Sequence, residues 1–266
     1  MVESQPTAEE SKNESITLEG VVCLIESSIP DEIKKLTDEE LVAKQKELSK
    51  LPYLSQEIFS ELLYPRGENL GLIMVDTYHI VGSISPEFED WSKQYDSRKG
   101  RHVAVAKQVI NPTPESVEKT FKISEPWFES GIRLKQLSTP EGELYFVIDG
   151  SHRVAGCKLA ELKQIPAYVE KVPEAKVVST MSSVLKSQWE ERIKRGLITG
   201  NIVEERDESG ELIYSFNINT QVLPWMYLSN DKFVAINKFY FEHFPQAEDV
   251  KSLLDNEPIP REALVD

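Results

Sequence analysis

The chain is poor in cysteine and has no long apolar run. Cys23 and Cys157 are its two cysteines among 266 residues, and neither belongs to a CxxC pair or to a Cys/His spacing that would suggest zinc. This usage indicates a reducing cytoplasm. No uninterrupted apolar run approaches the roughly 18 residues of a membrane span, and the N-terminus lacks the basic and apolar regions of a secretory signal. We therefore expect a cytoplasmic protein that has no membrane partner.

Positive charge is also scarce. The sequence has 30 Lys and Arg against 45 Asp and Glu, a formal net charge of -15. This excess disfavours nonspecific attraction to nucleic acid or anionic membrane, although a local basic pocket can still bind a phosphate. Small anionic ligands therefore rank above duplex DNA. The chain also has no Gly-x-Ser-x-Gly elbow, Walker-type phosphate loop or dinucleotide fingerprint, and those enzyme classes are set aside.

The chain divides into four segments. Residues 1–15 are polar, acidic and almost free of large apolar side chains, which predicts a disordered tail. Residues 16–100 are expected to form an N-terminal extension of helices and strands, and residues 101–175 a compact mixed core. Residues 176–266 are expected to form an aromatic-rich, mainly helical C-terminal extension that contains a hairpin. The predicted fold class is α+β.

Several elements have clear sequence signals. The stretch "TDEELVAKQKELSKL" predicts a helix that begins at Thr37, with Glu40 completing a capping box. "NPTPESVEKTF" predicts a second helix, with Thr113 as N-cap and Pro114 at the first helical position. Strands are predicted from "LGLIMVDTYHIVGS", "HVAVAKQVI" and "IPAYVEKV", and "IRLKQLS" with "ELYFVID" predicts a hairpin across "TPEG".

The C-terminal segment has its own pattern. "MSSVLKSQWEERIKRGL" predicts an amphipathic helix, and "RDESGE" predicts the turn of a hairpin. Further on, Phe233, Ile236 and Tyr240 fall at helical spacing. These side chains are interpreted as core or as a cap over the mixed core, with a lid that closes over substrate as the alternative.

The most informative stretch is "YFVIDGSHRVAGCKLAEL", an apolar strand that runs into a helix. Gly150 permits a tight backbone path, and the first N–H groups of the helix carry the positive end of its dipole. Ser151 is suited to cap the helix or donate to a phosphate, and His152 and Arg153 add further donors. Asp149 would repel a bare anion unless it holds a metal, orients a base or fixes His152. The alternative is purely structural: helix capping, with Arg153 paired to a surface carboxylate.

The stretch "VIDGSHRVAG", with the flanking helix and strand and the following "IPAYVEKV", resembles the ParB/sulfiredoxin superfamily, in which an apolar strand runs into D-G-x-H-R and a helix. The resemblance covers roughly 103–172 and implies a ParB/sulfiredoxin-like mixed core. This fold hosts partition proteins, sulfiredoxins, nuclease-like domains and free-serine kinases. Sulfiredoxins have a catalytic cysteine where this chain has Ser151. Partition proteins usually have a Gly-Glu-Arg-Arg motif and a basic helix-turn-helix domain, which this chain lacks.

The nearest functional resemblance is to the free-serine kinases, which place a catalytic carboxylate on the preceding helix. "NPTPES" makes Glu115 the matching general base, although Pro114 separates the Thr and Glu of the family pattern. The resemblance implies a nucleotide-dependent phosphotransferase that acts on a small hydroxyl-bearing molecule, with Glu115, Asp149 and His152 as catalytic residues. The alternative for Glu115 is an ordinary first-turn carboxylate that stabilises its helix.

The same resemblance implies the cofactors. Gly150, Ser151, His152 and Arg153 are expected to hold the phosphates of ATP or ADP, with CTP as an alternative, and Asp149 to assist through Mg²⁺ or by orienting the acceptor hydroxyl. The alternative function is a nonenzymatic ParB-like module that binds nucleotide or DNA and has a regulatory role. The sequence leaves the oligomeric state open.

Other polar residues are weaker candidates. "SRKGRH" places Arg98, Lys99 and Arg101 in a cluster that either joins a phosphate pocket or forms a solvated loop. His79 and His243 are isolated in the sequence and are expected to be packed or exposed rather than catalytic.

Overall fold

The computed structural model describes most of the first 179 residues and short stretches beyond them. The described residues are 16–54, 67–84, 90–92, 100–124, 131–139, 142–172, 175–179, 187, 190–191, 193–194, 203–206, 210, 212–218 and 242–245. The predicted tail over 1–15, most of the amphipathic helix predicted over 181–197, and the helical spacing of Phe233, Ile236 and Tyr240 lie outside this set.

The chain is mixed α and β, and its main sheet has five strands in the order β1-β5-β3-β4-β2. The pairs β1/β5 and β3/β4 are antiparallel, whereas β3/β5 and β2/β4 are parallel. The predicted hairpin and the "IPAYVEKV" strand are confirmed as β3, β4 and β5. The sheet combines two strands from residues 16–100 with three strands from residues 101–175. Its strands are β1 (Glu68–Asp76), β2 (Ile80–Ser83), β3 (Arg133–Thr139), β4 (Gly142–Asp149) and β5 (Gln164–Lys171).

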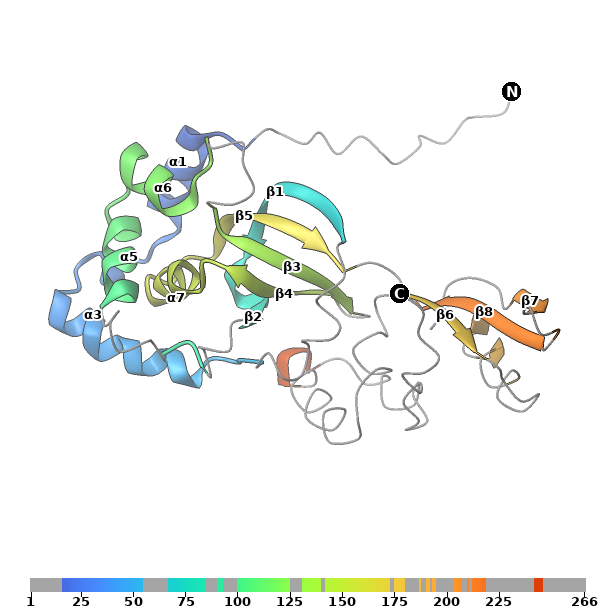
Figure 1. Cartoon of the computed structure of the whole chain (residues 1–266). Coiled ribbons are helices and arrows are strands. Elements are labelled where there is room, and N and C mark those ends of the chain that lie inside the picture. The colour runs from blue at the N-terminus through green and yellow to red at the C-terminus, as the bar shows by residue number, and fades with distance from the viewer. Residues whose placement is uncertain are drawn as a thin grey trace, which may run out of the picture.

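The larger helices lie together on one side of this sheet (Figure 1). The capping box of Thr37 and Glu40 is confirmed, as are Thr113 at the N-cap and Pro114 at the first position of the next predicted helix. The helical segments up to residue 159 are α1 (Leu18–Ser28), α2 (Asp31–Lys34), α3 (Asp38–Lys44), η1 (Gln45–Lys50), η2 (Thr77–His79), α5 (Arg101–Ile110), α6 (Pro114–Phe121) and α7 (Ser151–Leu159).

One predicted strand is wrong: "HVAVAKQVI" forms most of helix α5. The alternation of valine and alanine is typical of a strand, but the buried residues repeat at helical spacing. His102, Val103, Ala106, Val109 and Ile110 are all buried, which makes one continuous stripe at i, i+1, i+4, i+7 and i+8. Alanine favours a helix, and packing of this stripe decides the local conformation.

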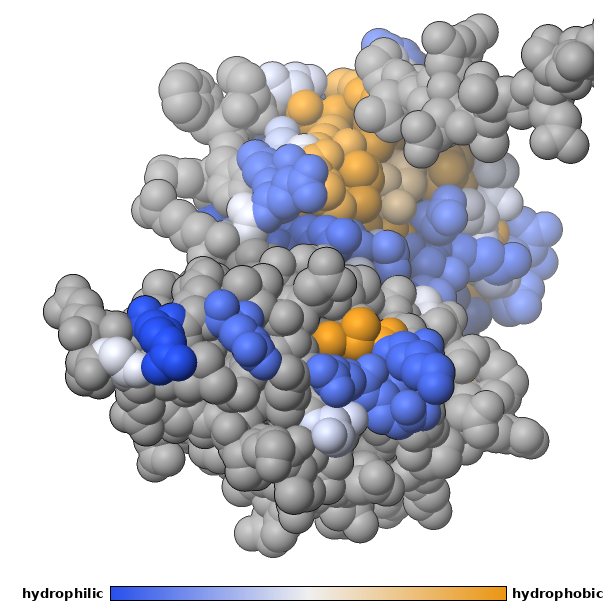
Figure 2. All heavy atoms as spheres, turned by 90° about the vertical axis from the view of Figure 1, so that its right-hand side faces the viewer, coloured by the Kyte–Doolittle hydropathy of each residue, from blue (hydrophilic) through white to orange (hydrophobic). Residues whose placement is uncertain are grey.

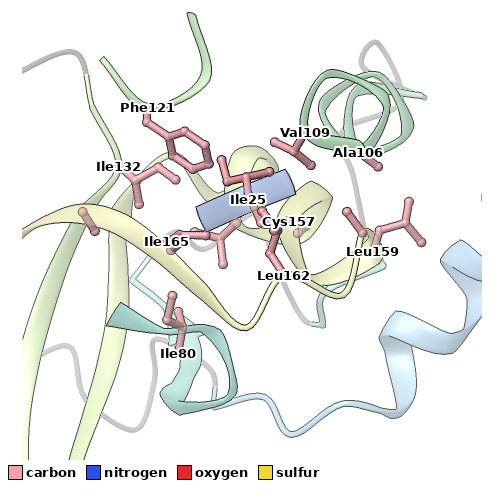
Figure 3. Packing of buried hydrophobic residues seen from close by; sticks show 14 of the residues in the cluster. Ile25, Ile80, Ala106, Val109, Phe121, Ile132, Cys157, Leu159, Leu162 and Ile165 are labelled. Atoms are coloured by element: carbon pink, nitrogen blue, oxygen red, sulfur yellow. The ribbon is translucent and has the colours of Figure 1, made fainter. Parts of the chain in front are cut away.

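The main core lies between the sheet and the helices (Figure 3). Ile25 of α1 and Phe121 of α6 meet Ile132, beside β3, and Ile165 of β5 in this cluster. Cys157 of α7 is fully buried there and packs as a small apolar residue. Burial also raises the pKa of its thiol to about 12, so the thiol stays protonated at neutral pH.

Helices α5 and α7 approach each other closely because α7 has a glycine at the crossing. A Cβ atom at Gly156 would lie 2.5 Å from Cβ of Val105 and 2.9 Å from the carbonyl oxygen of His102. Both distances are too short for a real Cβ contact, so the crossing depends on the missing side chain. This approach brings the start of α5 next to the start of α7.

A second sheet is antiparallel and has the order β6-β8-β7. Its strands β7 (Val203–Arg206) and β8 (Leu212–Ile218) confirm the hairpin predicted around "RDESGE", and β6 (Ala175–Ser179) is the third strand. Figure 2 shows the molecule from the side of this sheet, where the described residues form hydrophilic areas as well as apolar ones. Within the described part of the chain, no helix combines the length and apolar character needed to cross a membrane.

Candidate functional site

The turn between β4 and α7 has the conformation that the glycine predicts. Gly150 has a φ of 90° and is the N-cap of α7, and only glycine adopts such a backbone without strain. Its carbonyl oxygen accepts hydrogen bonds from the N–H groups of Arg153 at 2.8 Å and Val154 at 3.0 Å. Ser151 is therefore the first helical residue, which corrects its predicted role as the cap. The N–H groups of Ser151 and His152 precede the first intrahelical bonds.

The hydroxyl of Ser151 is tied to the neighbouring strand β2. Its Oγ lies 3.0 Å from Oγ of Ser83, and the Ser83 hydroxyl donates to the carbonyl oxygen of Val147 at 3.3 Å. The Ser83 side chain also hydrogen-bonds with Tyr53, and either serine can donate in the contact between the two hydroxyls. This buried pair fixes the start of α7 against the sheet.

Arg153 holds three segments of the chain together. Its Nη1 donates to the carbonyl oxygen of Thr120 at 3.3 Å, and its Nη2 donates to that of Gly131 at 3.0 Å. The same Nη2 lies 3.5 Å from Oδ2 of Asp149. Burial lowers the pKa of Arg153, and the carboxylate of Asp149 acts in the opposite direction, yet a guanidinium stays protonated in proteins. Arg153 therefore joins the end of α6 and the start of β3 to the turn.

The carboxylate of Asp149 faces the turn and remains largely open to solvent. Its Oδ1 accepts from the N–H of Gly150 at 2.8 Å, and its side chain is 55% exposed. Within the described part of the chain, no group of three or more metal-ligating side chains comes together. One exposed carboxylate fits Mg²⁺ that keeps waters and takes further ligands from substrate phosphates, but it does not fit a metal held by the protein alone.

A second histidine lies beside the predicted one. Nδ1 of His152 is 3.5 Å from Nε2 of His102 on α5, and Nδ1 of His102 is 3.3 Å from Nε2 of Gln45. His102 is fully buried, and burial together with the nearby His152 lowers its pKa to about 4. The sequence reasoning missed His102 because it treated "SRKGRH" as a source of cations. Helical periodicity over α5 would have placed this residue on the buried face.

Glu115 lies on a different element from the other predicted residues. Asp149, Gly150, Ser151, His152 and Arg153 are consecutive at the turn, whereas Glu115 is exposed in the first turn of α6. Arg153 contacts the last turn of α6 at Thr120. A helix rises about 1.5 Å per residue, so these two turns lie about 7.5 Å apart along the axis. The role of Glu115 as general base stays a prediction.

Of the remaining candidates, His79 lies near the C-terminal end of α7, whereas Arg101 directly precedes His102 at the start of α5. His79 and His243 are not isolated in space: their ring centroids are 5.5 Å apart, and Tyr78 stacks on His243 at 4.5 Å. His243 is buried, and η2, which holds His79, contacts α7 through Lys158, near the C-terminal end of that helix. Arg101 is the exposed first residue of α5. Arg98 and Lys99 lie outside the described residues.

No protein-family model, curated protein or solved structure matches this chain. A functional conclusion therefore depends on the geometry of the turn and on the resemblance of its sequence.

Proposed function

We propose that the chain is a nucleotide-binding phosphotransferase of the ParB/sulfiredoxin type, which transfers a phosphoryl group to a small hydroxyl-bearing molecule and holds the nucleotide phosphates at Asp149–Arg153. One observation carries this proposal. Gly150 adopts a left-handed conformation directly before α7, so the N–H groups of Ser151 and His152 point out of the positive end of the helix. A histidine side chain is fixed at the same end, and this combination suits phosphate oxygens.

Each residue of the turn has a distinct part in the proposal. The backbone N–H groups of Ser151 and His152 donate to phosphate oxygens, and the ring of His152 supplies a further donor. Arg153 contributes positive charge at short range, but its hydrogen bonds to the carbonyl oxygens of Thr120 and Gly131 give it a structural part as well. Asp149 provides an oxygen ligand for Mg²⁺ that arrives with ATP or ADP, or with CTP.

The transfer itself needs a group that accepts the proton of the acceptor hydroxyl. In the proposed step, that oxygen forms a bond to the terminal phosphorus, the bond from this phosphorus to the leaving phosphate oxygen breaks, and the hydroxyl proton passes to a carboxylate. Glu115 is the proposed acceptor of this proton. Because it lies at the opposite end of α6 from Thr120, an acceptor molecule has to reach along that helix from the turn.

A second candidate function is a nonenzymatic ParB-like module that binds nucleotide or DNA. Two observations favour it. The guanidinium of Arg153 directs donors at backbone carbonyl oxygens, which leaves fewer of them for a phosphate. Glu115 lies in the first turn of α6, whereas Arg153 contacts the last turn of that helix. Both observations are compatible with binding without turnover.

A titration with a matched pair of variants tests the proposal. We would measure the melting temperature of the full chain against ATP, ADP, CTP and duplex DNA, with and without Mg²⁺, for the native protein, His152→Gln and His79→Gln. The two substitutions are chemically identical, but His79 is on η2, which contacts the other end of α7. We expect a nucleotide to raise the melting temperature of the native protein and of His79→Gln, with the effect lost in His152→Gln.

Turnover is tested separately by ³¹P NMR of the native protein and Glu115→Gln with nucleotide, Mg²⁺ and free serine. A phosphorylated product formed only by the native protein would support the phosphotransferase. Nucleotide binding without product would favour the binding module, and a melting temperature that no nucleotide changes would rule out both nucleotide functions.

A further inference from the structure

Gln45 has a defined hydrogen-bond direction next to the histidine pair. Its Nε2 lies 3.4 Å from the carbonyl oxygen of Ser92 and 3.3 Å from Nδ1 of His102. A backbone carbonyl oxygen only accepts hydrogen bonds, so the side-chain group of Gln45 that faces it is the NH₂ group. The same NH₂ group faces His102, and Nδ1 of His102 is therefore the acceptor in that contact.

The hydrogen-bond direction between Gln45 and His102 also determines the direction between His102 and His152. His102 is fully buried, which favours its neutral form, and a neutral imidazole that accepts at Nδ1 carries its proton on Nε2. Nε2 of His102 faces Nδ1 of His152 at 3.5 Å. Since His102 donates from Nε2, Nδ1 of His152 has to accept.

We infer that Gln45 and His102 form a relay that fixes His152 in the tautomer with its proton on Nε2, so that His152 presents an uncharged N–H donor at the start of α7. Gln45 and His102 are positioning residues in this arrangement, because they act through His152 and not on a ligand. The inference deepens the proposed function and rests on it for the identity of the ligand, namely the phosphate oxygens of a nucleotide.

The relay also opposes the charged form of His152. A protonated His152 carries hydrogen on Nδ1, which would face the hydrogen on Nε2 of His102. His102 would then have to move its proton to Nδ1, where it would face the NH₂ group of Gln45. Either arrangement places two donors against each other at the fully buried ring of His102, and an unsatisfied buried donor is unfavourable enough to produce a preference of about tenfold or more. A neutral donor leaves the charge of the phosphates to be balanced by Mg²⁺, Arg153 and the helix dipole.

The relay can be tested by ¹⁵N NMR of the histidine side chains, without any ligand. In ¹⁵N-labelled protein at pH 7, the ring nitrogens of each histidine report which atom carries hydrogen, and the His152→Gln spectrum identifies the signals of His152. We expect a protonated Nε2 and an unprotonated Nδ1 for His152 in the native protein.

Two variants of Gln45 then show whether this residue sets the His152 tautomer or only packs against His102. Gln45→Glu offers a carboxylate, which accepts from Nδ1 of His102, reverses the relay and places hydrogen on Nδ1 of His152. Gln45→Met has a similar length but neither donates nor accepts strongly, so it should lose the tautomer preference without reversing it. A merely structural Gln45 would give the same His152 signals in both variants.

The outcomes distinguish the relay from the proposed function. A protonated Nδ1 on His152 in the native protein, or unchanged His152 signals in Gln45→Glu, would overturn the relay. If the tautomers are as inferred and Mg²⁺ with ATP, ADP or CTP shifts the Nε2–H signal, both inferences are supported. If the tautomers are as inferred but none of these nucleotides shifts any His152 signal, the relay stands and the proposed nucleotide site is wrong.

Discussion

Replacing Gly150 by alanine is expected to add both backbone strain and crowding at the turn. A Cβ atom at this position would lie 3.1 Å from Nε of Arg153 and 3.3 Å from Cα of Ile132, and the φ of 90° is itself unfavourable for alanine. We expect Gly150→Ala to lower the free energy of unfolding by about 1–3 kcal/mol and to weaken nucleotide binding. Urea denaturation gives the stability change, and a nucleotide titration gives the change in affinity.

Gly71 provides the matched control for this prediction. It also has a positive φ, of 76°, but a Cβ atom there would have no neighbour within 4 Å. Gly71→Ala should therefore show the backbone strain alone and leave nucleotide affinity unchanged. Equal losses of stability in the two variants would mean that crowding against Arg153 and Ile132 is unimportant.

The lowered pKa of His102 predicts that the protein loses stability in acid. Its pKa is about 4 in the folded chain against an ordinary value of 6.5, so between these two values the unfolded chain binds a proton that the folded chain does not. The free energy of unfolding therefore falls as the pH falls through this window, by about 3 kcal/mol in total from this group. His243 acts in the same direction, because burial lowers its pKa to about 4 as well.

The measurement is urea denaturation at a series of pH values from 7 down to 4, for the native protein and His102→Gln. Glutamine forms hydrogen bonds but does not titrate, so the variant should show a shallower dependence on pH in this window. The same slope in both proteins would contradict a neutral, buried His102.

At the scale of the elements, the crossing of α5 and α7 gives a prediction in which two effects oppose each other. Glycine to alanine in the middle of a helix normally stabilises by about 1 kcal/mol. At Gly156, however, the new Cβ would lie 2.5 Å from Cβ of Val105, and overpacking of this kind costs about 1–3 kcal/mol. We expect Gly156→Ala to destabilise the protein in chemical denaturation and to weaken nucleotide binding, because His102 moves away from His152.

The double variant Gly156→Ala/Val105→Ala checks the cause. It removes Cγ1 of Val105, which would lie 2.6 Å from the new Cβ, but Cβ of residue 105 at 2.5 Å and the carbonyl oxygen of His102 at 2.9 Å remain. Partial recovery of stability relative to Gly156→Ala is therefore expected. No recovery at all would place the strain elsewhere.

The elements whose signals are local could be predicted from the sequence. Thr113 and Pro114 start α6, and the apolar run into Gly150 predicts β4 followed by α7. For α5 two sequence signals compete: its valines and alanines alternate as in a strand, whereas the residues that packing buries repeat at helical spacing. The contact of His102 with His152 depends on two helices that meet in space, and the sequence gives no local signal for it. The position of Glu115 relative to the turn likewise depends on how α6 packs and has no local signal in the sequence.

At the scale of the whole molecule, the net charge of -15 predicts a dependence on salt. Excess negative charge destabilises the compact state through repulsion, and salt screens that repulsion. We expect the melting temperature to rise by a few degrees between about 10 mM and about 150 mM NaCl. A comparison of MgCl₂ with NaCl at equal ionic strength isolates specific binding of the divalent ion. A melting temperature that falls with salt would indicate that attractive charge pairs dominate.

Gln45 lies at the junction of α3 and η1, about a hundred residues before the turn in the sequence, and it contacts the histidine next to that turn. Under the proposed nucleotide function, we expect the first helices to be energetically linked to ligand occupancy. A molecule that binds at Asp149–Arg153 favours the conformations in which Gln45 is docked, and docking in turn favours the ligand by the same factor. Amide hydrogens of η1 should therefore exchange with deuterium more slowly when nucleotide is bound, and Gln45→Met should abolish this long-range protection.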